Sequence, residues 1–175
     1  VFLDLRGFTA FAETSEPELS GAAQLTWMNR LEDEQDNLRG ALEWSARDAI
    51  GSGLRLAAGL GEFWFNRDRF GEGTAHLLGL LSQPGAAGRT LERAKALNVA
   101  GGLLAWTLAD YETARKLVEE ALDIGRQLRD ALTIGRAKLA LGIIALGDDE
   151  WAQARRNLEE SLEIGRELGD HWAVA

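Results

Sequence analysis

The histidines of this sequence are its first candidates for metal chemistry. There are two of them, His76 and His171, and the chain contains no cysteine. Zinc and iron sites gather several histidine, cysteine or carboxylate ligands at short, characteristic spacings. Neither histidine has a companion ligand at such a spacing, so the sequence predicts no metal site and no cofactor. His76 lies between Ala75 and Leu77, a context that favours a half-buried position on a helix.

Two glycine pairs, Gly59-x-Gly61 and Gly71-x-Gly73, could be taken for loops that hold phosphate. A nucleotide-binding P-loop has the pattern G-x-x-x-x-G-K-[ST] between a strand and a helix. The sequence does not contain that pattern, and neither pair follows a strand or precedes a lysine. We expect these glycines to serve helix packing and turns.

Strings of carboxylates such as Glu32-Asp33-Glu34 and Glu159-Glu160 could supply acid and base groups. Acid/base hydrolases place two carboxylates on opposite sides of a cleft, whereas neighbours along a helix point in different directions. Nothing in the sequence predicts a desolvating pocket that would shift their pKa values. We therefore predict solvated helix surface, no catalytic residue and no enzyme activity.

The composition limits the class of protein further. The chain has 175 residues, 46% of them hydrophobic, which is enough for one domain or one continuous solenoid. Its 19 basic and 28 acidic residues give a net charge of −9, and such a surface repels nucleic-acid phosphates. No stretch approaches the roughly 20 apolar residues of a membrane helix, and no signal peptide is evident. We expect a cytoplasmic location, with neither nucleic acid nor membrane as a partner.

The sequence repeats itself at an interval of forty residues. Residues 114–130 (ARKLVEEALDIGRQLRD) and 154–170 (ARRNLEESLEIGRELGD) are identical at ten of seventeen positions. In the first copy Ala114, Val118 and Leu122 recur at the period of a helix and form one apolar stripe. Together with the near absence of proline, this predicts an all-helical protein.

Each repeat is predicted to hold two helices. The forty-residue offset also aligns Gly102 with Gly142 and Tyr111 with Trp151. We expect the glycine, on the first helix, to let a neighbouring helix approach closely, and the aromatic ring to open the second helix of each pair.

The repeats set the expected domain organisation. A weaker copy, at an offset of forty-one, pairs Gly61, Trp64, Phe70, Gly73 and Leu77 with residues of the next unit. The units are predicted at about residues 49–84, 90–130 and 131–170, preceded by a helical run over 25–46. A loop is expected at 82–88, where Pro84 and Gly85 interrupt helix propagation. Residues 171–175 match the opening of a further unit, so we expect the sequence to be a fragment.

The spacing of small residues in both strong copies resembles the tetratricopeptide repeat. The residues that carry this resemblance are Gly102, Ala114 and Ala121 in one copy, and Gly142, Ala154 and Ser161 in the next. The unit is about forty residues long, where about 34 is typical. The resemblance implies a right-handed superhelix of antiparallel helix pairs.

A second resemblance extends over residues 12–175. Its core is the pattern Trp27, Leu31, Glu34, Asn37-Leu38-Arg39, Ala41-Leu42 and Trp44. It is similar to the C-terminal repeat region of large bacterial signalling ATPases, which carry a LuxR-type DNA-binding domain or a class III adenylate/guanylate cyclase domain. This implies a role in signal transduction or transcription regulation, and we expect Trp27, Trp44 and Trp64 to pack in the core.

Residues 1–11 (VFLDLRGFTAF) resemble the opening of a class III nucleotide cyclase domain. The resemblance implies that Asp4 matches an aspartate that holds magnesium, an ion that prefers carboxylate oxygen. The remainder of a cyclase domain does not follow, because the repeat region begins almost at once. We interpret residues 1–11 as a remnant or a junction.

The binding surface is predicted on the first helix of each pair, which lines the concave face in helical repeats of this kind. The residues expected there are Arg55, Glu62, Phe65, Asn66, Trp106 and Arg136. Trp106 aligns with Leu146 of the next repeat, so packing does not require an aromatic ring. That Trp106 fills the seam between hairpins remains an alternative.

Three hypotheses about function follow. The first is a binding module for a protein, a peptide or a small effector. The second is a catalytically inactive fragment of a cyclase-linked protein. The third is a structural spacer or a self-association domain, which would make the protein a homo-oligomer.

Overall fold

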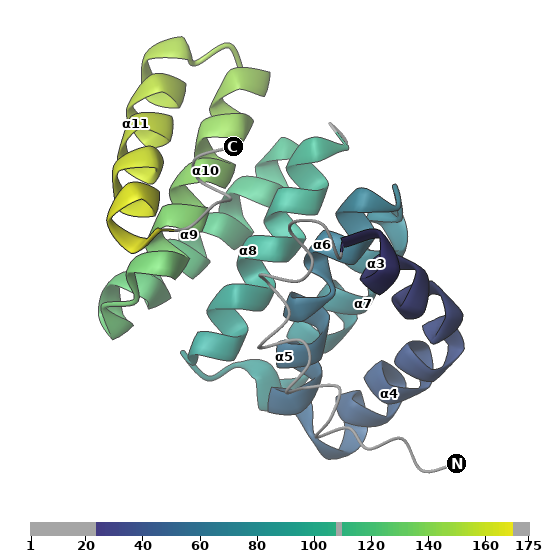
Figure 1. Ribbon diagram of the computed structural model, residues 1–175. Helices are drawn as coiled ribbons and strands as arrows, with labels where there is room; N and C mark the ends of the chain where they lie inside the picture. The colour runs from purple at the N-terminus through teal and green to yellow at the C-terminus, as the bar shows by residue number, and fades with distance from the viewer. Residues whose placement is uncertain (1–23, 108–109, 170–175) are drawn as a thin grey trace. The chain divides into compact units, whose positions relative to one another are not determined.

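The computed structural model describes residues 24–107 and 110–169, and all of the regular structure in these residues is helical (Figure 1). The prediction of an all-helical fold is confirmed. The chain separates into two compact units, residues 1–88 (unit 1) and 89–175 (unit 2). Each unit is described by itself.

Unit 1 is a set of short helices. They are α3 (Gln24–Asp33), α4 (Gln35–Asp48), α5 (Ile50–Gly59), α6 (Gly61–Asn66), α7 (Phe70–Leu81) and the 3-10 turn η1 (Pro84–Ala86). Helix α5 packs on α4 and α7. The core of unit 1 contains the buried side chains of Leu56, Phe63, Trp64 and Leu77.

The helical run expected over residues 25–46 is broken in the structure. Glu34, with φ −92° and ψ 8°, separates α3 from α4. The main-chain hydrogen bonds from Glu34 N to Arg30 O and from Leu38 N to Glu34 O continue across the break. Neither proline nor glycine marks it, so the sequence gives no local signal for it.

Trp44 does not pack in the core as predicted, since 42% of it is exposed. Helix α4 buries Leu38, Ala41, Leu42 and Ser45 instead, and this stripe passes beside Trp44. Ser45 can be buried because its hydroxyl donates to the carbonyl of Ala41 at 2.7 Å. Of the other two tryptophans, Trp64 is buried and Trp27 is half-buried.

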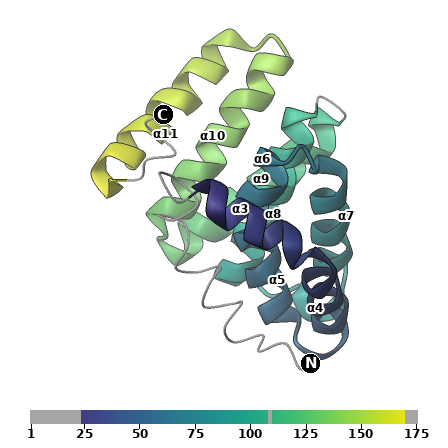
Figure 2. The ribbon, with the colours of Figure 1, turned by 45° about the vertical axis from the view of Figure 1, so that its right-hand side comes forward.

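Unit 2 consists of two long helical hairpins. The first pairs α8 (Leu91–Trp106) with α9 (Tyr111–Leu128), and the second pairs α10 (Ala131–Gly147) with α11 (Trp151–Leu168). Figures 1 and 2 show α10 and α11 side by side. As predicted, Tyr111 and Trp151 open the second helices.

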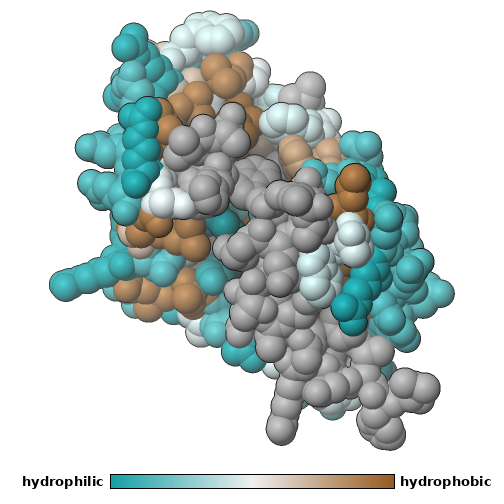
Figure 3. All heavy atoms as spheres, viewed as in Figure 1, coloured by the Kyte–Doolittle hydropathy of each residue, from teal (hydrophilic) through white to brown (hydrophobic). Residues whose placement is uncertain are grey.

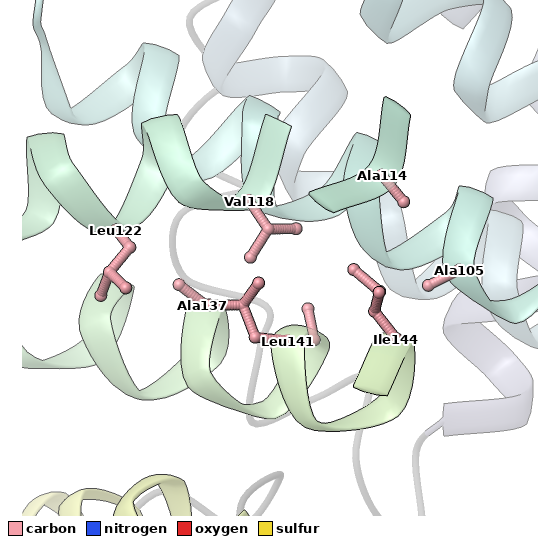
Figure 4. Packing of buried hydrophobic residues seen from close by; sticks show 8 residues of the cluster. Ala105, Ala114, Val118, Leu122, Ala137, Leu141 and Ile144 are labelled. Atoms are coloured by element: carbon pink, nitrogen blue, oxygen red, sulfur yellow. The ribbon is translucent and has the colours of Figure 1, made fainter. Parts of the chain in front are cut away.

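The core of unit 2 lies where the two hairpins meet. Side chains from α9 and α10 interlock there, with Ala105 of α8 beside them (Figure 4). Val118 of α9 and Ile144 of α10 are completely buried in this cluster. The apolar stripe predicted from Ala114, Val118 and Leu122 is therefore the face that α9 turns toward α10.

The glycine that brings α8 close to α9 is Gly101, and the prediction of Gly102 is wrong. A Cβ added to Gly101 would lie 2.3 Å from Val118 Cγ2 and 3.0 Å from Ala114 O, whereas one added to Gly102 would meet nothing within 4 Å. In the second hairpin a Cβ on Gly142 would meet Leu158 at 2.6 Å.

The first helices therefore correspond at an offset of forty-one, while the second helices correspond at forty. The loop within each hairpin accounts for this difference of one residue. Four residues, 107–110, connect α8 to α9, and three, 148–150, connect α10 to α11. Helix packing depends on which position of the first helix faces the second helix. Alignment by residue identity alone therefore placed α8 one position out of register with α10.

Candidate binding surface

The six residues predicted for the concave face lie on two helices of each unit. Unit 1 contributes Arg55 on α5 and Glu62, Phe65 and Asn66 on α6, and unit 2 contributes Trp106 on α8 and Arg136 on α10. Asn66 and Trp106 are exposed, and the other four residues are half-buried. Each is thus at least partly accessible.

In unit 1 the predicted residues make local contacts. Asn66 Nδ2 donates to the carbonyl of Glu62, one turn earlier, at 2.8 Å. The ring of Phe65 meets that of Phe70 edge to face, with centroids 5.7 Å apart. Arg55 Nη2 lies 3.3 Å from the hydroxyl of Ser52. The amide of Asn66 and the ring of Phe65 are therefore partly held by their own helix and by α7.

In unit 2 the two predicted residues lie at different heights along the first helices. Asn98 Nδ2 of α8 donates to the carbonyl of Thr133 of α10 at 3.0 Å, which places these two positions side by side. Trp106 lies about 12 Å beyond Asn98 along α8, and Arg136 about 5 Å beyond Thr133 along α10. A ligand that contacts both must extend along the helices.

The offset of forty-one gives Trp106 a different counterpart in the second hairpin. At an offset of forty-one its counterpart is Gly147, the last residue of α10, and not Leu146. Gly147 has no room for a side chain, because the ring of Tyr111 lies against it and would come within 2.2 Å of an added Cβ. Trp106 is 51% exposed. The first helix of the first hairpin therefore ends in an exposed aromatic residue, whereas that of the second hairpin ends in a glycine packed against an aromatic ring.

Apolar side chains reach the surface of unit 2. Trp151, the counterpart of Tyr111, is 64% exposed, and Leu128 and Leu146 are also exposed. Figure 3 shows hydrophobic residues at the surface over α9 and α10 among hydrophilic ones. Aromatic side chains of this kind are frequent anchors in protein interfaces.

The basic residues on the inner sides of the hairpins are paired with carboxylates of the second helices. Arg93 Nε of α8 lies 2.7 Å from Glu120 of α9. Lys138 Nζ of α10 lies 2.8 Å from Glu160 of α11 and 3.2 Å from Asn157 Oδ1. These pairs hold each hairpin together, so they add little positive charge to its surface.

Arg115 connects the two hairpins of unit 2. Its Nη2 donates to Asp148 at 2.7 Å and to Glu150 at 3.3 Å, both in the loop between α10 and α11. The hydrogen bond to Asp148 raises the pKa of Arg115, although burial opposes it. The link fixes the loop of the second hairpin to α9.

Glu72 is the centre of a polar cluster in unit 1. It accepts hydrogen bonds from Gln35 at 3.2 Å, Arg39 at 2.8 Å and Arg69 at 3.3 Å. Burial raises the pKa of Glu72, but the hydrogen bond and charge of Arg39 outweigh that effect and hold it below its usual value. The carboxylate ties α4 to α7.

His76 is half-buried on α7, as predicted. The prediction that it has no companion ligand overlooked Glu72, whose Oε1 lies 4.0 Å from His76 Nε2 one turn away. The imidazole also stacks on Trp64, with centroids 6.1 Å apart. In the part of the chain that the structure describes, no three histidine, aspartate or glutamate residues gather in a way that could hold a metal ion.

Asn98 and Thr133 are the residues that sequence reasoning missed. Both are buried, and Asn98 Oδ1 and Thr133 Oγ1 find no hydrogen-bond partner among the described residues. The one available signal was a lone amide in the apolar run Ala96-Leu97-Asn98-Val99-Ala100.

The predictions for residues 1–11, including Asp4, and for residues 171–175, including His171, lie outside the described residues. No helix within residues 24–107 and 110–169 is long and apolar enough to cross a membrane.

Comparison with known families matches residues 92–167 to a tetratricopeptide repeat model. The match runs from α8 into α11 and therefore covers both hairpins of unit 2. It supports, for this part of the chain, the resemblance seen in the small residues. No curated protein matches the chain.

Proposed function

We propose that this chain is a protein- or peptide-binding helical repeat module of a bacterial signalling ATPase. The observation that carries the proposal is the tetratricopeptide match over α8–α11, since such repeats generally mediate protein–protein interaction. The hairpins add first helices with accessible aromatic and arginine side chains, which are favoured binding anchors.

The signalling context rests on the N-terminal part of the repeat region. The pattern from Trp27 to Trp44, which resembles the repeat regions of these ATPases, lies on α3 and α4. In such a protein the module would bind a protein, a peptide or a small effector and pass its occupancy to a nucleotide-switched domain. No catalytic role is assigned to the module.

The contact residues we propose are those predicted on the first helices: Arg55, Glu62, Phe65, Asn66, Trp106 and Arg136. Trp106 and Arg136 are the sharpest to test, because both lie within the matched residues and on neighbouring first helices.

The test is selection of binding peptides, followed by affinity measurement with variants. We expect Trp106→Ala and Arg136→Ala each to weaken a selected peptide by about tenfold or more, as for interface anchors. The matched controls are Trp151→Ala and Arg156→Ala, which remove exposed residues of the same types from α11. Equal effects of the test and control variants would contradict the proposed surface.

Self-association is the second candidate function. The observation that favours it is the exposure of Trp151 and Leu168, at the two ends of α11. Light scattering of the wild-type chain and of Trp151→Ala distinguishes the candidates, because a monomer at all concentrations would exclude self-association.

A further inference from the structure

We propose that unit 2 self-associates end to end, so that one end of its hairpins binds the opposite end in a second copy of the chain. This inference rests on self-association, the second candidate function, and specifies the two surfaces that meet. The acidic end comprises Trp106 and residues 146–151, and the basic end comprises residues 126–129 and 166–168.

The contacts of α10 place the helix ends of unit 2 in these two groups. Near the start of α10, a Cβ added to Gly125 of α9 would meet Thr133 at 2.9 Å, and Ile164 of α11 lies as close to a Cβ added to the fifth residue of α10. The last residue of α10, Gly147, lies against the ring of Tyr111, which opens α9. The 17 residues of α10 separate the two groups, a distance of about 25 Å.

The exposed apolar side chains of unit 2 are confined to these two ends. Trp106, Leu146 and Trp151 are exposed at the acidic end, and Leu128 and Leu168 at the basic end. Within residues 89–107 and 110–169, no other large hydrophobic residue is as exposed as these five. Removing apolar surface from water is favourable, so each end gains from contact with another apolar surface.

The acidic end keeps negative charge that its own residues do not neutralise. Arg115 is shared between Asp148, at 2.7 Å, and Glu150, at 3.3 Å, so one positive charge faces two negative charges. Asp149, between these two residues, is exposed and makes no ion pair with a described residue. The apolar residues of this end are therefore bordered by net negative charge.

The basic end has the opposite charge. Arg126 and Arg129 at the end of α9 and Arg166 in the last turn of α11 are exposed, and none of them forms an ion pair with a described residue. Asp130 and Glu167 lie at the same end, but the arginines outnumber them, and the carboxylate of Asp130 is already bonded to a main-chain N–H of α10. Net positive charge therefore borders the apolar residues here.

The two ends complement each other. Each end offers apolar side chains for burial and carries charge of the sign that the other end attracts, a combination that favours their contact. A second copy of the chain is the partner that follows, because every copy presents the matching end. Contact between unlike ends is heterologous, so each copy keeps one free end and the assembly can grow past a dimer.

Light scattering of the full chain over a series of concentrations is the test. The wild type should pass the mass of a dimer at the highest concentrations. Arg166→Glu and Asp149→Arg should each weaken the association by about tenfold, because like charges then meet at the contact. The left-handed backbone at Asp149, with φ 59°, can accept an arginine, since Arg129 adopts φ 58°.

An equal mixture of the two variants is the sharper measurement. The intact acidic end of Arg166→Glu meets the intact basic end of Asp149→Arg, and the two altered ends attract each other because both charges are reversed. The mixture should therefore associate about tenfold more tightly than either variant alone.

Arg47→Glu is the matched control. Arg47 is an exposed arginine in the last turn of α4, as Arg166 is in the last turn of α11. The two variants therefore make the same change in net charge and lose the same favourable interaction with a helix C-terminus. Arg47→Glu lies in unit 1 and should leave the association unchanged.

The outcomes separate the end-to-end contact from the candidate function on which it rests. If the wild type associates and Arg166→Glu and Asp149→Arg associate as tightly as Arg47→Glu, self-association stands and the end-to-end contact is overturned. A mass that stops at a dimer, or a mixture no tighter than the single variants, would also overturn the contact. If the wild type is a monomer at every concentration, self-association fails and the inference fails with it.

Discussion

The two hairpins of unit 2 share a sequence pattern but differ inside. In the first hairpin, Leu97 of α8 and Ala121 of α9 are completely buried. In the second, their counterparts are Lys138, paired with Asn157 and Glu160, and Ser161, whose hydroxyl donates to the carbonyl of Gly135 at 2.9 Å.

The contrast separates two uses of buried polarity. Within the second hairpin the polar side chains find partners on the facing helix, so they can fix the pairing of α10 with α11. Between the hairpins, Asn98 and Thr133 keep atoms without a described partner. The paired groups of the second hairpin therefore contribute to its structure.

The largest expected effect tests the close contact of the first hairpin. Gly101→Ala places a methyl group against the stiff side chain of Val118 and the main-chain oxygen of Ala114. It should lower the free energy of unfolding by about 2–3 kcal/mol, measured by urea denaturation. Gly142→Ala should cost less, because its main obstacle is the flexible side chain of Leu158 and the nearest main-chain oxygen, of Ala154, is 3.5 Å away.

Gly102→Ala is the control, since its added methyl group meets nothing within 4 Å. Alanine is favoured over glycine inside a helix by about 0.5–1 kcal/mol, so this variant should be more stable than the wild type. If Gly102→Ala lost more stability than Gly101→Ala, the first helices would correspond at an offset of forty and not of forty-one.

The polar interior of the second hairpin gives the next largest effect. Lys138→Met leaves the buried Oδ1 of Asn157 without its partner, at an expected cost of about 1–3 kcal/mol. The double variant Lys138→Met, Asn157→Leu rebuilds the apolar interior of the first hairpin and should recover much of that loss. Urea denaturation of both single variants and the double variant measures the coupling. Additive losses would show that the two side chains do not act as a pair.

Local pattern predicted the fold class well and the contacts less well. Tyr111 and Trp151 open their helices as expected because this position depends on the turn before them. The close contact was assigned to Gly102 instead of Gly101 because the correspondence depends on loop length, and the loop after α8 is one residue longer than the loop after α10. At an offset of forty, Gly102 also aligns with Gly142. Asn98 was missed because only its neighbours in space show that an atom lacks a partner. Trp44 was wrongly predicted to lie in the core because the buried stripe of α4 contains a serine, Ser45, at a position where an apolar residue is expected.

A smaller effect is expected at the N-termini of the second helices. Asp110 caps α9 by accepting from the main-chain N–H of Thr113 at 2.9 Å, whereas Glu150 makes no side-chain cap for α11. Hydrogen bonds from Thr113 lower the pKa of Asp110. The stabilisation is therefore complete above the pKa of the unfolded chain and is lost as the pH falls through the lower folded value.

Asp110→Ala should lower the thermal midpoint at neutral pH, and the difference from the wild type should shrink in acid. Asp110→Asn retains a capping oxygen that does not titrate, so it should reduce the acid dependence while keeping most of the stability. Thermal melts at a series of pH values measure both effects. An unchanged acid dependence in Asp110→Asn would remove Asp110 as its source.

The smallest effect compares the ends of the same two helices. Both α9 and α11 end in a left-handed residue, Arg129 with φ 58° and Gly169 with φ 67°. Glycine adopts this conformation without the clash that a Cβ causes. Arg129→Gly should therefore stabilise the protein by up to about 1 kcal/mol, and Gly169→Ala should destabilise it by a similar amount. Arg126→Gly, one turn earlier inside α9, is the control and should be destabilising. If urea denaturation shows that Arg129→Gly is destabilising as well, then the side chain of Arg129 contributes more than its backbone costs, and the ends of the two hairpins are not equivalent.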